Sequence, residues 1–380
     1  MTVLKKAERV NEANPAAIAA TVVWGAFVLA LVFGAVASKT NFCLMGAVSD
    51  IVNMGDWTRM RMWLLATAIA ILGTAGLQLA GTIDVAKTVY TTPNFTWLSY
   101  LCGGFFFGVG MTLGSGCGSK TLIRIGGGNL KSFVVFLVLA VSAYMTLKGL
   151  FGVFRAAAID PVAVVLPTAQ DMPSLLAKWL GGGRNAMLTA CAGIIGLGLL
   201  VFAFMSREFR TFDNLLGGVV VGLVIVAGWY LSGGLGYLTE DPSTLEEKFF
   251  ATNSGRMESM SFVAPLAYFL ELLLLWSDTS RVMTFGIACA LGVAAGSLVY
   301  ALATRSFRLE SFRDAEDLIN HLVGGALMGF GGVLAMGCTI GQGLSGVSTL
   351  ALGSFLAWFS IMAGAALTIK IQYWRLLREG

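Results

Sequence analysis

The chain has 380 residues, of which 57% are apolar and only 12% are charged, against about 25% charged residues in a typical soluble domain. With a mean hydropathy of +0.80, this composition excludes a soluble protein and predicts a polytopic membrane protein. The formal net charge of +4 is too small to indicate nucleic-acid binding, and the basic residues fall in short groups typical of membrane-topology signals.

Nine apolar runs follow along the chain, and we interpret each as a transmembrane helix in a single membrane domain, residues 1–380. They cover residues 17–37, 62–80, 97–113, 132–153, 185–205, 214–233, 282–303, 321–336 and 350–373. An odd number of spans places the termini on opposite faces. Short loops rich in Lys and Arg fall on the C-terminal face, which predicts a cytoplasmic C-terminus and a periplasmic N-terminus. The polar segment 1–14 has no obvious cleavage site, so we expect the first helix to be retained.

The six cysteines and the single histidine, His321, limit the chemistry that this chain can perform. The cysteines form no CxxC pair and no metal-ligand pattern, so we expect no disulfide framework, no metal site and no cofactor. One histidine at the polar edge of an apolar run cannot serve as the base for several cysteines. The sequence therefore favours a protein that is not an enzyme.

The second half of the chain repeats features of the first. A shift of 221 positions aligns GGFFFGVGMTLGSGC at 103–117 with GGALMGFGGVLAMGC at 324–338, with seven identities in fifteen positions. A shift of 220 pairs Phe42 with Phe262. We therefore expect repeat units at 21–155 and 214–374, joined by a linking helix at 185–205. Corresponding spans are five apart in order and cross the membrane in opposite directions, which predicts an inverted repeat with the permeant's site between the two units.

The helical pattern breaks at three places, and each break contains a cysteine. The breaks are SKTNFCLMGAVSD at 38–50, LGSGCGSKTLIRIGGGN at 113–129 and AMGCTIGQGLSGVS at 335–348. Backbone that leaves the helix at membrane depth must be buried in protein or line a wet cavity. If a short re-entrant helix starts at each cysteine, its free N–H groups and positive dipole end favour an anion beside the sulfur. The breaks therefore predict a path for an anion that tolerates a thiol.

These motifs resemble those of the YeeE/YedE family of membrane sulfur transporters, in particular its thiosulfate-uptake branch. The resemblance covers nearly the whole chain and rests on FCLMGAVSD at 42–50, GGFFFGVGMTLGSGCG at 103–118 and VGGALMGFGGVLAMGCTIGQG at 323–343. It implies a transporter in the bacterial inner membrane that takes up thiosulfate, or a closely related sulfur oxyanion, past one cysteine from each motif. We assign to this path Cys43, Cys117 and Cys338, with Asn41, Gly116, Gly118, Lys120, Gly337, Thr339 and Gln342 beside them.

Two departures from the family pattern bear on substrate and partners. Relatives often have Gly-Gly-Cys where this chain has Ser115-Gly116-Cys117 and Met336-Gly337-Cys338, and some have a basic residue at the position of Ser49. Some relatives also carry a fused sulfur-carrier domain with a Cys-Pro motif. No cysteine here precedes a proline, so a TusA-like sulfur carrier would be a separate protein.

Several residues have two interpretations. Three cysteines lie within apolar spans and are expected to be small core residues: Cys102, Cys191 and Cys289. Lys120 and Arg124 either attract a dianion or anchor a helix end at the membrane surface. Asp50 and Glu271 lie in apolar surroundings, where an acidic residue is costly enough to suggest proton coupling or pairing with Arg61, and a structural ion pair is an equal alternative.

Two other functions are compatible with the sequence. One is a membrane thiol enzyme that handles sulfane sulfur, although no base or paired cysteine accompanies the motif cysteines. The other is a transporter of the same fold that carries a selenium compound or another anion.

Overall fold

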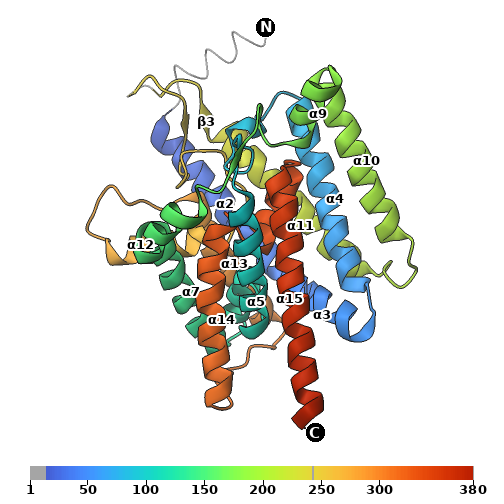
Figure 1. The fold of residues 1–380 in the computed structure, drawn as a ribbon. Coiled ribbons are helices and arrows are strands. Elements are labelled where there is room, and N and C mark those ends of the chain that lie inside the picture. The colour runs from blue at the N-terminus through green and yellow to red at the C-terminus, as the bar shows by residue number, and fades with distance from the viewer. Residues whose placement is uncertain (1–13, 242–243, 380) are drawn as a thin grey trace.

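The computed structural model describes residues 14–241 and 244–379, which fold almost entirely into helices (Figure 1). Among these residues, nine helices are long and apolar enough to cross a membrane. The chain is therefore an all-α multi-pass membrane protein, as its composition predicts. Residues 1–13, which carry most of the polar N-terminal segment, lie outside the described residues.

The elements follow one another with short connections. The helices are α2 (Pro15–Thr40), α3 (Leu44–Met54), α4 (Thr58–Leu79), η1 (Val85–Lys87), α5 (Trp97–Leu113), α6 (Gly118–Gly126), α7 (Leu130–Lys148), α8 (Leu150–Phe154), η2 (Arg155–Ile159), α9 (Met172–Leu180), α10 (Arg184–Phe204), α11 (Phe212–Tyr230), η3 (Leu231–Leu235), α12 (Ala264–Leu274), α13 (Phe285–Ala303), α14 (Ala315–Leu334), η4 (Gly341–Gly346) and α15 (Leu352–Glu379). Two antiparallel two-stranded pairs complete the structure: β1 (Asn94–Phe95) with β2 (Val164–Val165), and β3 (Tyr237–Leu238) with β4 (Lys248–Phe249).

Each of the nine predicted spans has its helix, and the differences lie at helix ends. The start of α14 precedes the predicted residue 321 because a polar first turn, capped by Asp314, begins the helix before its apolar stretch. The predicted run 132–153 is divided, because Gly149 leaves helical geometry between α7 and α8. The sequence analysis assigned no helix to residues 264–274, which form the short α12.

The long helices pack through glycines that the repeat aligns. A methyl group on Gly108 of α5 would lie 2.2 Å from the carbonyl oxygen of Ile361 on α15. A methyl group on Gly329 of α14, the aligned position, would lie 2.5 Å from the carbonyl oxygen of Leu139 on α7. Such close backbone approach is how helices associate where burial of apolar surface gives little driving force. The glycines of the aligned motifs therefore hold α5 and α14 in the interior.

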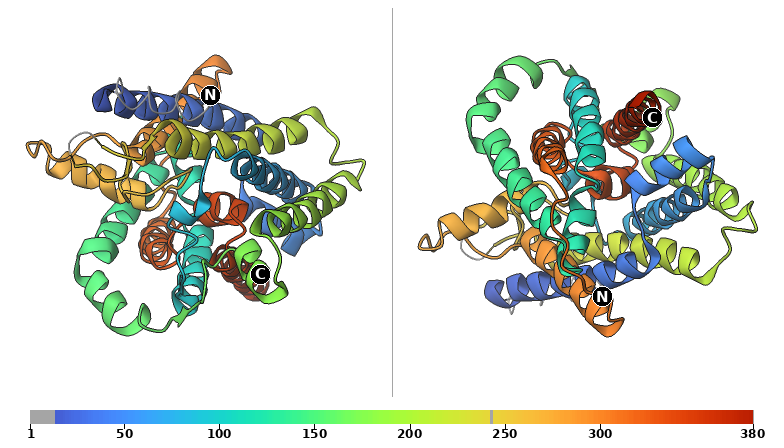
Figure 2. Two further views of the ribbon diagram at one scale, coloured as in Figure 1. Left: turned by 90° about the horizontal axis from the view of Figure 1, so that it is seen from above. Right: turned by 90° about the horizontal axis from the view of Figure 1, so that it is seen from below.

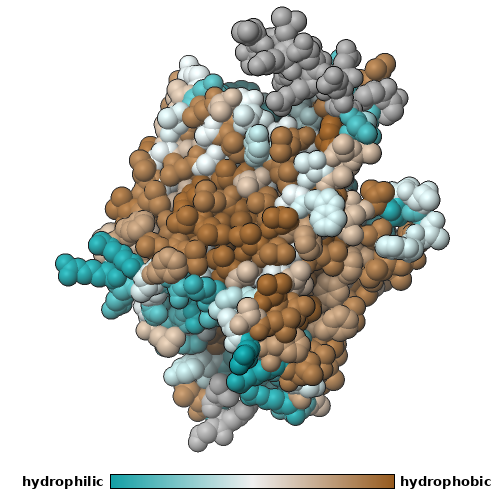
Figure 3. Space-filling model, turned by 180° about the vertical axis from the view of Figure 1, so that it is seen from behind, coloured by the Kyte–Doolittle hydropathy of each residue, from teal (hydrophilic) through white to brown (hydrophobic). Residues whose placement is uncertain are grey.

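The surface and the centre of the molecule differ in character. From behind, apolar side chains form a broad band across the middle of the surface, with hydrophilic groups mostly below it (Figure 3). In both views of Figure 2 the red-orange segment around η4 lies near the centre of the molecule, among the long helices. Residues 337–351 are all buried. The third cysteine break is thus the most enclosed part of the chain.

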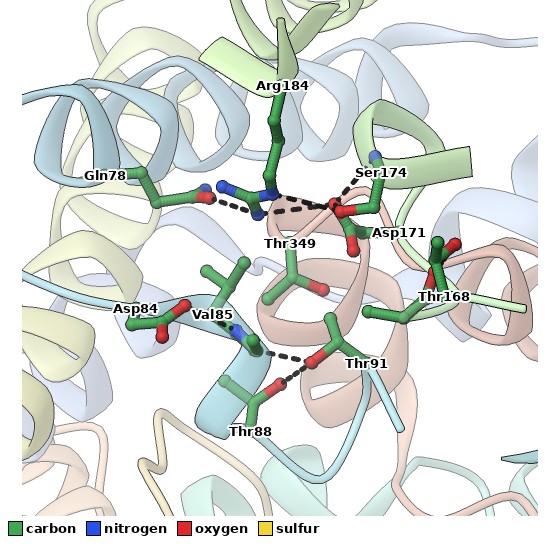
Figure 4. Close-up of polar contacts among 12 residues, drawn as sticks. Gln78, Asp84, Val85, Thr88, Thr91, Thr168, Asp171, Ser174, Arg184 and Thr349 are labelled. Atoms are coloured by element: carbon green, nitrogen blue, oxygen red, sulfur yellow. Dashed lines mark hydrogen bonds and ion pairs between the residues drawn. The ribbon is translucent and has the colours of Figure 1, made fainter. Parts of the chain in front are cut away.

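A polar network fastens this central segment to the end of the molecule opposite the C-terminus (Figure 4). Asp171 caps α9, and Arg184 of α10 donates to its carboxylate at 3.3 Å, to the Ser174 hydroxyl at 3.0 Å and to the side-chain carbonyl of Gln78 on α4 at 3.2 Å. The backbone beside Asp171 pairs with Ala351. The connection before α9 therefore fixes the position of the residues that follow η4.

Candidate functional site

The three cysteine breaks share one backbone geometry. Two positions before each cysteine stands a non-glycine residue in the left-handed region: Asn41 (φ 51°), Ser115 (φ 56°) and Met336 (φ 56°). Such a conformation costs a non-glycine residue about 1 to 3 kcal/mol, so it persists only where the surrounding structure requires it. A helical segment begins directly after each cysteine, as expected from the sequence.

Each cysteine lies directly before the first residue of its short helix. The sulfur of Cys43 accepts a hydrogen bond from the backbone N–H of Gly46 at 3.5 Å, and the sulfur of Cys338 accepts one from Gly341 at 3.3 Å. Cys117 caps α6, with its sulfur 3.3 Å from the hydroxyl of Ser119. All three thiols are free and buried. Each sulfur therefore lies where a helix N-terminus offers donors and positive potential.

The three cysteines also form one neighbourhood. Cys117 is a near neighbour of both Cys43 and Cys338. The backbone of Phe262 hydrogen-bonds the thiol of Cys338, and a methyl group on Gly118 would lie 2.9 Å from the Phe262 carbonyl oxygen. The chain segment before α12 therefore runs between the second and third breaks. Sequence reasoning aligned Phe262 with Phe42 but did not assign it to the site.

The first two breaks border a cavity of about 550 Å³, here called the basic cavity. The predicted residues Asn41, Cys43 and Lys120 meet there. Its charged lining consists of four cations and one acid: Arg59, Lys120, Arg124, Arg308 and Glu310. The lining therefore carries a net positive charge, which favours binding of an anion.

Local structure explains how the cations reach the basic cavity. Lys120 and Arg124 are one helical turn apart on α6, and the stem of Lys120 passes over Gly116, where a methyl group would lie 3.1 Å from its Cγ. Arg308 lies in the loop between α13 and α14. Its backbone N–H donates a hydrogen bond to the carbonyl oxygen of Gly127 at 3.1 Å. Neither Arg308 nor Arg59 was among the predicted site residues.

The third break lies deeper than the basic cavity and carries no charge. Thr339 and Gln342 are fully buried, and neither the hydroxyl of Thr339 nor the side-chain carbonyl oxygen of Gln342 has a hydrogen-bond partner. The amide nitrogen of Gln342 donates to the carbonyl oxygen of Ala335, across the break. Buried polar atoms are nearly always paired, so two orphans beside one cysteine are an unusual feature.

A second cavity, of about 210 Å³, borders the third break and is here called the Glu258 cavity. Met336 and Gly337 line it together with Glu258, Arg155 and Tyr268. A third cavity, of about 360 Å³, surrounds Glu271 and shares Tyr268 and Asn253 with the second. The predicted site residues are therefore not in one pocket. Asn41, Cys43 and Lys120 line the basic cavity and Gly337 lines the Glu258 cavity, whereas six predicted residues are in neither lining: Gly116, Cys117, Gly118, Cys338, Thr339 and Gln342.

The acidic residues of the spans form ion pairs, but not with Arg61. Asp50 pairs with Arg59 at 3.0 Å, and Glu271 pairs with Lys148 at 2.8 Å. Arg61 instead donates to the backbone carbonyl of Phe202 at the end of α10. Pairing of Arg61 with either acid was therefore a wrong expectation, because the orientation of α4 points its side chain toward α10.

The remaining cysteines lie apart from this arrangement. Cys102 faces an apolar surface groove between α5 and α15, Cys191 lies in α10, and the sulfur of Cys289 is 3.8 Å from the carbonyl oxygen of Ala26. None of the three lines the basic cavity or the Glu258 cavity.

Comparison with known proteins shows the family of this chain. Residues 39–367 match the family model described as sulphur transport. The chain is 26% identical over 329 residues to the thiosulfate transporter TsuA of Escherichia coli (strain K12), covering 82% of this chain and 83% of that protein. It is 25% identical over 356 residues to the thiosulfate transporter TsuA of Spirochaeta thermophila, covering 90% and 96%. The chain belongs to the sulphur transport family of membrane proteins.

Proposed function

We propose that this protein takes up thiosulfate by moving the anion between the Glu258 cavity and the basic cavity, past Cys338, Cys117 and Cys43. The observation that carries the proposal is the set of three buried free thiols, each directly before a short helix, with Cys43 in the lining of the basic cavity and the two residues before Cys338 in the lining of the Glu258 cavity. The relatives named as thiosulfate transporters support the choice of substrate.

The charge of thiosulfate explains why helix starts and cations are both needed. Moving a dianion out of water costs several kcal/mol unless fixed positive potential replaces the lost hydration. A helix N-terminus supplies only about half a unit charge. Lys120 and Arg124 add full charges next to Cys43. We therefore assign to these cations the capture or release of the anion at the basic cavity.

The thiols suit the conduction step because they interact weakly. A neutral thiol is a soft, weak donor that contacts the terminal sulfur of thiosulfate without holding it tightly. Several weak sites in sequence permit passage, whereas one strong site would retain the anion. This role needs no oxidation of the cysteines and no chemical change of the substrate.

We further propose that the transporter is an inverted repeat in the bacterial inner membrane, with the C-terminus in the cytoplasm. The packing is consistent with a pseudo-two-fold axis in the membrane plane: α2 packs on α13 and α11 on α4, while α5 packs on α15 and α14 on α7. In this orientation the basic cavity faces the cytoplasm. A separate TusA-like sulfur carrier would receive thiosulfate on that face.

Uptake of labelled thiosulfate tests the proposal directly. Purified protein in proteoliposomes is expected to accumulate or exchange labelled thiosulfate, with unlabelled thiosulfate but not sulfate as an effective competitor. Analysis of the internal label would distinguish transport from chemistry, because a thiol enzyme would release altered sulfur species. Intact protein that neither exchanges nor accumulates thiosulfate would contradict the proposed function.

A further inference from the structure

Among the residues that the structure describes, Glu258 is the one acidic side chain that lines the cavity beside the third break. It lies in the connection between β4 and α12, and hydrogen bonds with Ser232 hold its backbone in place. One carboxylate oxygen accepts from the backbone N–H of Ser254 at 3.0 Å and from the Ser254 hydroxyl at 2.6 Å. Among the ion pairs of the described residues, none involves Glu258. The carboxyl group therefore faces the cavity without a cationic partner.

The groups around Glu258 define its electrostatic setting. Arg155 lines the same cavity, but its guanidinium pairs with Asp160 at 3.0 Å. The phenols of Tyr90 and Tyr268 line the cavity too. The thiol of Cys289 is a further titratable group near Glu258.

Charges farther from the cavity are already engaged. The neighbouring Arg256 is exposed and donates to the carbonyl oxygen of Thr88. Beyond Tyr268, the acid Glu271 is shared by Lys148 and Arg281. Glu258 is half-buried, and the partial loss of solvation raises the pKa of its carboxyl above the ordinary value, although the hydrogen bonds from Ser254 act in the opposite direction.

The position of Glu258 brings it close to any anion that passes Cys338. Met336 and Gly337, the two residues before Cys338, line the same small cavity. An ionised carboxylate there would repel a dianion through a poorly screened medium. A protonated carboxyl would remove that repulsion and offer an O–H donor. Binding of the proton and binding of the anion therefore favour each other, and this coupling is reciprocal.

We propose that Glu258 takes up a proton when thiosulfate occupies the cavity beside Gly337, so that inward movement of the anion is coupled to inward movement of a proton. This inference rests on the proposed function. It also meets an energetic need, because a dianion moves inward against the inside-negative potential of a bacterial membrane and a co-transported cation offsets part of that charge. In the proposed orientation the Glu258 cavity faces the more acidic periplasmic side.

Two transport assays on the same proteoliposomes test the coupling. With acid outside, wild-type uptake is expected to rise several-fold over uptake without a pH gradient, whereas thiosulfate exchange at equal pH needs no gradient. Glu258→Gln, which mimics the protonated form, is expected to retain exchange but to lose the acceleration by acid. Glu246→Gln changes an exposed glutamate of the preceding connection, between β3 and β4, and is expected to behave as wild type.

Proton uptake on binding gives a test that does not depend on transport by the variant. Addition of thiosulfate to the purified wild-type protein in weakly buffered solution is expected to make the medium more alkaline, and Glu258→Gln is expected to abolish this change. Binding by the wild type without proton uptake, or undiminished acid acceleration in Glu258→Gln, would overturn the inference. Absence of exchange in the wild type would instead contradict the proposed function.

Discussion

The breaks at Cys117 and Cys338 begin alike and continue differently. Each has a left-handed residue two positions before the cysteine and a helix directly after it. After Cys117, the regular helix α6 carries Lys120 and Arg124 into the basic cavity. After Cys338, the chain widens into a π-helical turn, Gly341–Gly346, in which every residue is buried and none is charged.

This difference separates two tasks that one ion path requires. Full charges at a cavity attract an anion and raise its local concentration. Neutral polar atoms in a closed interior discriminate among anions by contact and hold them weakly. We therefore expect changes after Cys117 to act mainly on apparent affinity, and changes after Cys338 to act mainly on rate and selectivity.

The largest effect is expected where the two breaks are alike, at their sulfurs. Cys117→Ala and Cys338→Ala should each reduce thiosulfate uptake to background in cells that lack other sulfate and thiosulfate importers, while protein abundance in the membrane stays normal. Cys289→Ala and Cys102→Ala are the matched controls, since these thiols lie within the regular helices α13 and α5 and not at a break, and should transport as wild type. Full uptake by the Cys117→Ala, Cys338→Ala double variant would show that the motif cysteines are packing residues.

A smaller effect is expected at the break after Cys117, where the helix carries cations. Lys120→Ala removes one cation from the basic cavity and should raise the apparent KM for thiosulfate about tenfold, the equivalent of roughly 1.4 kcal/mol. The effect should shrink at high salt, because screening weakens attraction between charges near water. Lys370→Ala changes an exposed lysine of α15 and should leave KM unchanged. Equal KM values for the two variants would indicate that Lys120 only anchors a helix end at the membrane surface.

The uncharged break at Cys338 is tested at Thr339. Its hydroxyl is buried without a partner, so Thr339→Val should leave the thermal stability in detergent unchanged or raise it by up to about 1 kcal/mol. If that hydroxyl serves the passing anion, the same change should lower the maximal uptake rate about threefold, as loss of one hydrogen bond would. Thr368→Val on α15, which loses a satisfied bond to Gly364, should show normal uptake. Normal uptake by Thr339→Val would exclude this role.

The smallest effect is expected from relief of the backbone strain that both breaks share. Ser115→Gly and Met336→Gly place glycine at positions with φ of 56°, which glycine adopts freely. Each change should raise the free energy of unfolding by about 0.5 to 1 kcal/mol, with uptake within twofold of wild type. Thermal unfolding in detergent measures the gain. A marked loss of stability would mean that the Ser115 or Met336 side chain holds its break in place.

Features that depend on neighbouring residues were predictable from the sequence. Apolar runs located all nine long helices, because a membrane span is a local property of about twenty residues. The aligned glycines and cysteines located the breaks, and the helix starts after Cys43 and Cys117 followed from the same motifs. Each of these features depends on residues within a single segment of the chain.

Features that join remote segments were decided only by the tertiary structure. Arg308 enters the basic cavity beside Lys120, although 188 positions separate them, because the loop after α13 pairs with the end of α6. Asp50 pairs with Arg59 instead of Arg61, since the two arginines point from different sides of α4. Glu258 gains its place beside Gly337 only through packing of the α12 connection against α14. Composition and periodicity carry no information about such contacts, because side-chain direction and the approach of distant helices are set by how the whole molecule packs.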